Sequence, residues 1–230
     1  MSLTTAGVIP LQAGDWAFVL DSWGYLSGGV AITIGLTIAS MLLGFFAGFP
    51  AGVLEVYGSR LFRAPIRFLG TLFRGTPLVV ILIFTYFVFP IGNAFVAAVL
   101  GLGLRSAAYQ SQIFRGALSS IDEGQMEAAR ATGMSRFQAI RHVIVPQALR
   151  RSMPGFQNEF TIVLKDTSLA FAIGMAELLT RTHDLFVQQT TAVLELFLVA
   201  SAIYFVLTFG TNRALDALEN YFAIPTGDTT

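Results

Sequence analysis

Residues 122–151 read DEGQMEAARATGMSRFQAIRHVIVPQALRR and form the longest polar stretch of the chain. Good helix formers fill its first part, and Gly133 lies where a helix would end on a glycine. Ser135 and Gln138 have the spacing of a capping box, which predicts the start of a second helix. Pro146 is expected to kink or end that helix. The stretch therefore predicts two short helices joined by a tight turn, a rigid elbow suited to transmitting a push.

The second helix of this elbow is expected to bury an apolar face. Phe137, Ile140, Val143 and Ile144 recur at helical spacing and would form that face. A loop lying on a membrane surface is the alternative for the whole stretch.

On both sides of the elbow the chain is strongly apolar. Hydrophobic residues make up 54% of its 230 residues and charged residues only 12%, whereas a soluble domain carries about 25% charged residues. The mean hydropathy is +0.68, so lipid is the expected solvent. The formal net charge is zero, which gives no field for binding nucleic acid. The chain has no cysteine, which excludes disulfides and thiolate chemistry. The first Lys or Arg is Arg60, so the N-terminus is not expected to be a secretory signal peptide.

Runs without charge mark the expected membrane spans. The sequence predicts an all-α polytopic membrane protein, a single domain over 1–230 with a coupling segment at 120–146. A turn of the sequence FPIGN at 89–93 would join the second span to the third. Each span reaches the roughly 20 residues that a bilayer helix needs. The five predicted spans lie near 27–54, 68–90, 93–115, 147–173 and 190–212.

Arginine placement predicts the orientation of these spans. Eleven arginines lie in the segments after spans one and three and in the tail, and only Arg181 lies on the other side. By the positive-inside rule, the N-terminus is expected outside, and the elbow and the C-terminus in the cytoplasm of a prokaryote. The eleven are Arg60, Arg63, Arg67, Arg74, Arg115, Arg130, Arg136, Arg141, Arg150, Arg151 and Arg213.

Glycines recur at four-residue spacing in the first span, at Gly44, Gly48 and Gly52. Small residues at this spacing let helix backbones approach closely. Packing within the chain is the favoured interpretation, and a dimer face is the alternative.

The elbow resembles the EAA signature of ABC importer permeases, on the residues EAARATGMSRFQAIRHVIVPQAL at 127–149. Three further stretches resemble the polar amino-acid branch of these type I importers: RGTPLVVILIFTYF at 74–87, AAYQSQIFRGALSSI at 107–121 and LKDTSLAFAIGMAEL at 164–178. The resemblance covers about residues 28–215. It implies a permease subunit of an ATP-driven amino-acid importer, working as a dimer with a second copy or a homologue.

The resemblance also implies partners. Two cytoplasmic ABC ATPase subunits would use ATP and Mg, and an extracytoplasmic amino-acid-binding protein would deliver the substrate. The docking residues would be Glu127, Ala128, Ala129 and Gly133. The residues themselves agree that the motor is another polypeptide, because a P-loop needs Gly-Lys and the only lysine, Lys165, follows Leu164.

Four charged residues fall inside predicted spans: Arg105, Glu159, Lys165 and Asp166. A charge at this depth costs about 2.5 kcal/mol or more, so each must face protein or water. The alternative to a binding role is that these charges pair with one another, Lys165 with Asp166 in particular, and lock helices together. Arg105 has no acid one turn away on its own helix, which favours a binding role for it.

Helical spacing places other polar side chains beside these charges. One face would carry Arg105, Tyr109 and Gln112, and the neighbouring span would add Thr161. The stretch DTS at 166–168 looks like a helix restart, with Thr167 and Ser168 among good N-caps, and a broken helix would offer free N–H groups to a carboxylate. The substrate path is therefore predicted to use Arg105, Tyr109, Gln112, Glu159, Thr161, Lys165, Asp166, Thr167 and Ser168.

The sequence departs from the family at three positions. Arg105 stands where relatives commonly have Asn or His, Gln112 where they have Glu, and Ile81 where they have Gln. One more positive and one fewer negative group favour a neutral or acidic amino acid, such as glutamine or glutamate, over arginine or lysine.

Two other functions are weighed against this one. An ion-coupled secondary transporter of a small polar solute needs no elbow, and an intramembrane enzyme needs a nucleophile with a base at depth. Ser168 beside Asp166 is a thin basis for catalysis. No metal site is expected, because His142 and His183 are predicted on opposite sides of the membrane.

Overall fold

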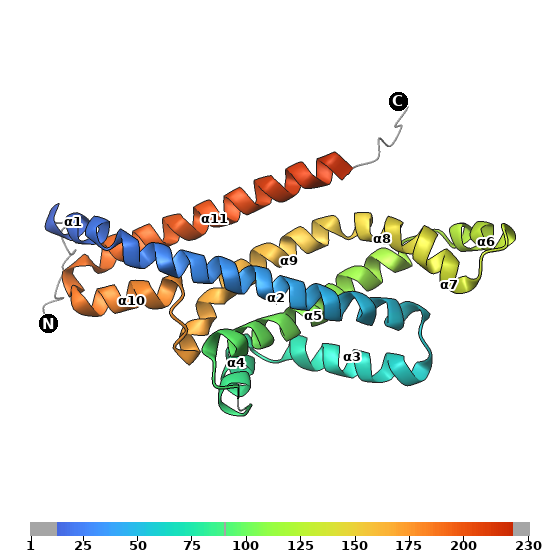
Figure 1. Ribbon diagram of the computed structural model, residues 1–230, viewed down its shortest axis with the longest axis horizontal. Coiled ribbons are helices and arrows are strands. Elements are labelled where there is room, and N and C mark those ends of the chain that lie inside the picture. Colours follow the sequence, from blue (N-terminus) through green and yellow to red (C-terminus); the bar gives the residue numbers. More distant parts are fainter. Residues whose placement is uncertain (1–12, 90, 223–230) are drawn as a thin grey trace, which may run out of the picture.

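The computed structural model describes residues 13–89 and 91–222, and the regular elements in this part are all helical (Figure 1). The α-helices are α1 (Ala13–Asp21), α2 (Trp23–Tyr57), α3 (Arg60–Gly75), α4 (Leu78–Phe87), α5 (Ala94–Ser119), α6 (Glu123–Ala131), α7 (Arg136–Ala139), α8 (Val145–Arg151), α9 (Met153–Asp166), α10 (Leu178–Gln188) and α11 (Val193–Phe222). A π-helical turn, η1 (Ile140–Ile144), joins α7 to α8, and the 3₁₀ helices are η2 (Thr167–Ile173) and η3 (Thr190–Ala192).

Helices α2 and α5 form the spine of the molecule and pack along each other. Gly48 and Gly52 of α2 permit this approach, because a Cβ atom at Gly48 would lie 2.7 Å from the carbonyl oxygen of Ala107. At Gly52 it would lie 2.9 Å from the carbonyl oxygen of Ser111. The glycine repeat therefore serves packing within the chain, as predicted.

The predicted span near 68–90 is not one continuous helix in the structure. Helix α3 ends at Gly75, α4 begins at Leu78, and the two helices are bent by 106°. Pro77 causes the break, because it has no N–H to donate and disfavours a helical backbone in the residue before it. Thr76 accordingly has an extended backbone, with φ −92° and ψ 132°.

The turn between α4 and α5 has the predicted glycine and asparagine geometry. Pro90 lies outside the described residues. Gly92 has a positive φ of 63°, and the side chain of Asn93 accepts a hydrogen bond from the backbone N–H of Val96. Asn93 thus caps the N-terminus of α5.

The elbow is confirmed in its main features. Gly133 has a φ of 89° and its N–H donates to the carbonyl of Arg130, while the N–H of Met134 donates to that of Ala129. These two bonds are a Schellman motif. Ser135 and Gln138 form the capping box at the start of α7.

Two details of the elbow differ from the prediction. Pro146 does not end the helix, because the helical backbone continues through the π-helical turn η1 into α8, where Pro146 lies in the first turn. Phe137 is 69% exposed, so it does not share the buried face on which Ile144 is only 2% exposed.

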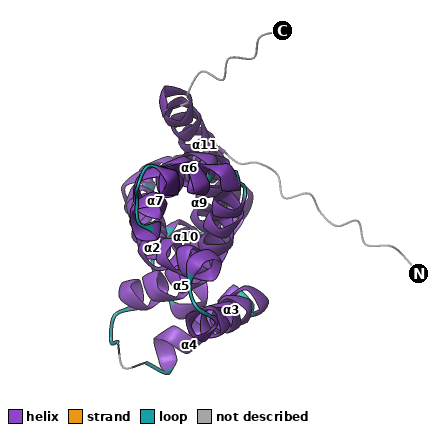
Figure 2. Ribbon diagram, turned by 90° about the vertical axis from the view of Figure 1, so that its right-hand side faces the viewer, coloured by secondary structure: helices purple, strands orange, loops and turns teal. Residues whose placement is uncertain are grey.

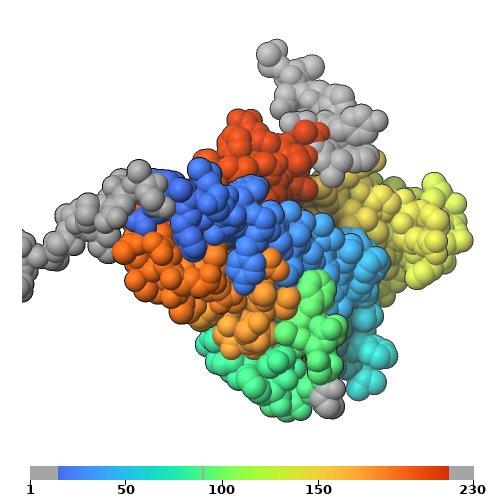
Figure 3. Space-filling view, turned by 60° about the vertical axis from the view of Figure 1, so that its left-hand side comes forward, coloured from blue at the N-terminus to red at the C-terminus, as the bar shows by residue number. Residues whose placement is uncertain are grey.

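The elbow and the start of α3 lie at one end of the long axis, and α1 and α10 lie at the other (Figure 1). Seen along that axis, α3 and α4 lie on one side of the bundle and α11 on the opposite side (Figure 2). The space-filling view shows α11 as a ridge on the bundle (Figure 3). Its side chains Phe205, Val206 and Phe209 are more than half exposed.

Among the described residues, two helices are long and apolar enough to cross a membrane, Trp23–Tyr57 and Thr190–Ala217, and the bent α3–α4 pair gives a third by the same measure. Helices α5 and α9 lie within predicted spans but do not pass. Helix α9 has only 14 residues and is too short by this measure. Helix α5 is long enough, but its polar side chains Arg105, Gln110 and Gln112 lower its hydropathy.

Candidate functional site

The polar residues predicted in the path gather where α5 passes the C-terminal end of α9. Arg105 of α5 donates from Nη1 to Oδ2 of Asp166 at 2.5 Å. Their side chains are 20% and 23% exposed. The pair is therefore sheltered but reachable, and it holds a fixed positive and a fixed negative group side by side.

Tyr109 lies one turn along α5 from Arg105. The guanidinium carbon of Arg105 lies 5.0 Å from the centre of the Tyr109 ring, within the range of a cation–π contact. This contact and the ion pair together fix the direction of the Arg105 side chain.

A second acid, Glu159 of α9, lies behind this pair in the packed interior and is 3% exposed. Ser106 donates to its Oε1 at 2.8 Å, and Gln110 donates to Ser106 Oγ at 3.0 Å. We name Arg105, Ser106, Tyr109, Glu159 and Asp166 the interior cluster.

The alternative that the charges pair with one another across helices is borne out for Arg105 and Asp166, but the particular pair expected between Lys165 and Asp166 is not formed. Lys165 is exposed and takes part in no ion pair within the described part of the chain. Asp166 pairs with Arg105 on another helix instead. The absence of an acid one turn away on α5 therefore did not show that Arg105 is unpaired, because its partner lies on another helix.

The expected helix break at Asp166 takes another form. The α-helix ends there, but it continues directly into the 3₁₀ helix η2, and Asp166 caps nothing. Thr167 and Ser168 donate from their hydroxyls to the carbonyls of Leu164 and Lys165 rather than accepting from free N–H groups. A row of free donors is therefore not formed at this point.

Two more predicted path residues lie outside the interior cluster. Thr161 donates to Oδ1 of Asn212 at 2.6 Å and ties α9 to α11. Gln112 donates to Oε1 of Glu55 at 2.9 Å and accepts from Nε of Arg115 at 2.8 Å. Sequence reasoning missed Glu55, although it is a single acid at the end of an otherwise charge-free run.

At the elbow, three of the four predicted docking residues are exposed: Glu127, Ala128 and Gly133. Ala129 is only 5% exposed and faces the chain's own core, so its small side chain serves the closing of the elbow. The ring of Phe137, which helical periodicity assigned to the buried face, is exposed.

A cavity of about 420 Å³ opens beside the elbow. Its lining combines residues at the end of α2 with Met126, Glu127 and Arg136 of the elbow, and includes Tyr57, Leu118 and Ile144. The guanidinium carbon of Arg136 lies 6.0 Å from the centre of the Tyr57 ring. The elbow is thereby held against the ends of α2 and α5, so a displacement of the elbow would be passed to both helices.

Comparison with known proteins gives one family over most of the chain. Residues 31–222 match the model of the family described as binding-protein-dependent transport system inner membrane component. The chain is 33% identical over 218 residues to the probable amino-acid permease protein YxeN of Bacillus subtilis (strain 168), covering 92% of this chain and 97% of that protein. It is also 33% identical to the glutamine transport system permease protein GlnP of Escherichia coli (strain K12) over 216 residues, covering 91% and 98%.

Solved structures give the same picture. The crystal structure of an amino acid ABC transporter with histidines matches with a TM-score of 0.80 and 30% identity, covering 89% of this chain and 97% of that one. An inward-facing form of the MetNI methionine ABC transporter matches with a TM-score of 0.71 at 21% identity, which shows a shared fold.

Proposed function

Because this chain belongs to the family of binding-protein-dependent transport system inner membrane components, we propose that it forms the membrane path of an ATP-driven importer of polar amino acids. The chain is a permease subunit of a transport system and not an enzyme, and ATP hydrolysis belongs to a separate subunit. The observation that carries the proposal is the exposed elbow, which packs against the ends of α2 and α5. Helix α5 in turn lines the polar interior. The names of the amino-acid permeases that it matches support the substrate class.

The interior cluster is the part of the path that we assign to the substrate. A free amino acid is a zwitterion, and the Arg105–Asp166 pair offers a cation for its carboxylate and an anion for its ammonium. A substrate that inserts between the two replaces one ion pair by two, which limits the desolvation penalty of burying its charges.

The charge balance of this cluster favours a neutral polar amino acid. The extra positive charge of Arg105, which set the chain apart from its family, is compensated by Asp166 at 2.5 Å. A lone extra cation would have favoured acidic substrates as well. Glutamine is therefore a better expected substrate than glutamate, and arginine the least favoured of the three.

Five membrane passages fit the chain best, with the N-terminus outside and the elbow and C-terminus in the cytoplasm. Helices α2 and α11 and the bent α3–α4 pair would supply three, and the more polar α5 and α8–η2 segments would supply two that face the path. The arginines support the orientation, since Arg60, Arg130 and Arg136 lie in the elements at the elbow end and Arg181 lies in α10.

The elbow is proposed to dock on an ABC ATPase. Glu127 offers an exposed carboxylate to a basic group, Ala128 permits close approach, and the Gly133 turn fixes the angle between α6 and α7. Two such ATPases, a second permease copy or homologue, and an extracytoplasmic amino-acid-binding protein would complete the importer. ATP and Mg would be bound by the ATPase partner.

Reconstituted vesicles test this function. The chain, co-purified with its ATPase and supplied with binding protein, is expected to take up glutamine only when ATP is present on the elbow side. Uptake that survives removal of the ATPase, and follows an ion gradient instead, would establish a secondary transporter and overturn the proposal.

A further inference from the structure

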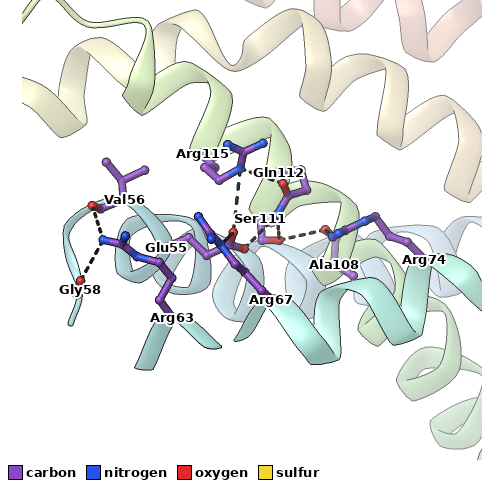
Figure 4. Close-up of polar contacts among 10 residues, drawn as sticks. All are labelled: Glu55, Val56, Gly58, Arg63, Arg67, Arg74, Ala108, Ser111, Gln112 and Arg115. Atoms are coloured by element: carbon purple, nitrogen blue, oxygen red, sulfur yellow. Dashed lines mark hydrogen bonds and ion pairs between the residues drawn. The ribbon is translucent and has the colours of Figure 1, made fainter. Parts of the chain in front are cut away.

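A polar pocket of about 290 Å³ lies between the ends of α2, α3 and α5, away from the interior cluster (Figure 4). This volume is at the lower end of the roughly 300–1,000 Å³ of small-molecule sites. Every residue of the lining is polar, and the lining has three guanidinium groups and one carboxylate, a formal excess of two positive charges. Arg67 and Arg115 lie against the carboxylate, whereas Arg74 donates to the carbonyl of Ala108. The lining residues are Glu55, Arg67, Thr71, Arg74, Gln112 and Arg115.

The single acid of the pocket is occupied by the protein itself. The Glu55 side chain is 2% exposed, and its Oε2 lies 3.6 Å from Nε of Arg67 and 3.9 Å from Nε of Arg115. Gln112 donates to its Oε1. Glu55 thus holds both arginines by their inner nitrogens.

The outer nitrogens of these arginines are left for another partner. Among the described residues, Nη1 and Nη2 of Arg67 and Arg115 make no hydrogen bond within the protein. Their side chains are 58% and 43% exposed. Paired guanidinium nitrogens of this kind suit the oxygens of a phosphate group, which they bind in bidentate fashion.

A second pocket, of about 160 Å³ and almost wholly apolar, lies between the same three helices. Its lining consists of small and apolar side chains, with Ser111 as the one polar member: Ala47, Ala51, Ile66, Leu69, Gly70, Phe73, Leu104, Ala107, Ala108 and Ser111.

The two pockets are neighbours along α2 and α5. Ala51 precedes Glu55 by one turn of α2, about 6 Å at 1.5 Å per residue, and Ser111 directly precedes Gln112 on α5. The polar pocket is the nearer of the two to the C-terminal ends of α2 and α5, and the elbow begins directly after the end of α5. An occupant of both would therefore have its charged end toward the elbow and its apolar part toward the middle of the bundle.

From these two pockets we infer a binding site for an anionic phospholipid of the leaflet on the elbow side. Its phosphate and headgroup lie against Arg67, Thr71 and Arg115, and part of one acyl chain lies in the apolar pocket. The neighbouring face of α3 exposes Phe68, Leu69 and Leu72, which are between 49% and 67% exposed and suit contact with lipid chains. A free phosphate would satisfy the polar pocket only, and would leave the apolar one unexplained. The site is independent of the proposed transport function, since it requires only that this face lies in a bilayer.

Native mass spectrometry of the full-length chain, in the assembly in which detergent extracts it, tests the site. The probes are phosphatidylglycerol, phosphatidylcholine of the same acyl chains, and inorganic phosphate. Phosphatidylglycerol is expected to bind at least about tenfold more tightly than phosphatidylcholine, because its headgroup has a net negative charge, whereas the choline cation of phosphatidylcholine offsets the phosphate charge and is repelled by the arginines.

Two variants and one control locate the binding. Arg67→Gln is expected to weaken phosphatidylglycerol about tenfold, whereas Arg60→Gln, on the same helix but outside the pocket, leaves it unchanged. Ala47→Leu fills the apolar pocket from an exposed position and is expected to weaken the lipid without changing the binding of inorganic phosphate.

Three results would overturn the inference. Equal binding of the two lipids would remove the role of the headgroup charge. An equal loss in Arg67→Gln and Arg60→Gln would indicate general attraction to the basic helix. If inorganic phosphate bound the protein and displaced phosphatidylglycerol, while Ala47→Leu left lipid binding unchanged, the polar pocket would be a site for free phosphate. Because the readout is lipid binding, each result is separable from success or failure of amino-acid uptake.

Discussion

Arg105 and Asp166 stand 61 residues apart in the chain, yet Nη1 of the first lies 2.5 Å from Oδ2 of the second. This pair joins α5, which leads into the elbow, to the point where α9 gives way to the 3₁₀ helix η2. A substrate that separates the two side chains would act directly on the contact between these two segments. The pair thus connects the proposed binding event to the helix that leads into the elbow, where we propose that the ATPase docks.

Replacing either partner of this pair is expected to abolish most substrate stimulation. We expect Arg105→Gln and Asp166→Asn each to lower substrate-stimulated ATP hydrolysis by roughly ten- to a hundredfold, since each leaves an uncompensated charge in the interior. Because the two residues are in contact, the double variant should be little worse than either single one. The ATPase activity of the reconstituted complex measures this. Losses that simply multiply in the double variant would show that the residues act independently.

Lys165→Met is expected to leave assembly intact. The lysine is exposed and has no ion pair within the described residues, so it does not lock helices in this chain. The amount of complex recovered and its melting temperature should match the wild type. Substrate-stimulated ATP hydrolysis should fall, because charged residues inside membrane spans usually serve function. Poor recovery of the complex would instead show that Lys165 holds a partner subunit in place, and would contradict this prediction.

The elements that the sequence predicted correctly are those decided by local chemistry. Gly133, the Ser135–Gln138 capping box and the Asn93 turn act within a few residues, and each has the expected geometry. The bend at Thr76–Pro77 follows from the same local rules but was not predicted. The span was placed from a long charge-free run, and the effect of Pro77 on the helix was not considered.

The interior cluster was predicted only in composition. Helical spacing correctly placed Arg105 beside Tyr109, but spacing on one helix carries no information on neighbours from another. Asp166 reaches Arg105 across the bundle, and Glu55 of α2 accepts a hydrogen bond from Gln112 of α5. Both outcomes depend on how α2, α5 and α9 pack, and the residue spacing along a single helix does not show which helices become neighbours.

The close approach of α2 and α5 should be sensitive to a single methyl group. Gly48→Ala would bring a Cβ to 2.7 Å from a backbone oxygen, which cannot move as a flexible side chain would. We expect a loss of about 1–3 kcal/mol in stability from this overpacking. Gly35→Ala on the same helix is the matched control, because its nearest contact is the Phe95 ring at 3.7 Å. Thermal unfolding of the purified complex should separate the two variants, and equal melting temperatures would contradict the packing role of Gly48.

The turn of the elbow should resist substitution for a different reason. At Gly133 an added Cβ meets nothing within 4 Å, but the φ of 89° is a conformation that L side chains rarely adopt. Gly133→Ala is expected to cost about 1–2 kcal/mol locally and to reduce the amount of ATPase that co-purifies. Gly116→Ala, which also meets nothing within 4 Å but lies inside α5 without a positive φ, should be neutral or slightly stabilising. If both variants retained the ATPase equally, the shape of this turn would not matter for docking.

Charge reversal on the elbow provides the sharpest test of coupling. Glu127 is exposed on α6 and lines the cavity beside the elbow, so Glu127→Gln removes one charge and Glu127→Lys reverses it without disturbing a buried contact. Like charges placed face to face at an interface cost several kcal/mol. We therefore expect a graded loss, with the lysine variant at least about tenfold weaker than wild type in ATP-driven uptake, measured together with the ATPase retained on purification. Gln125→Lys is the control, because it adds a positive charge to the same exposed helix two residues away. Comparable losses in Gln125→Lys and Glu127→Lys would point to general repulsion of the partner, whereas full uptake by Glu127→Lys would remove this residue from the docking surface.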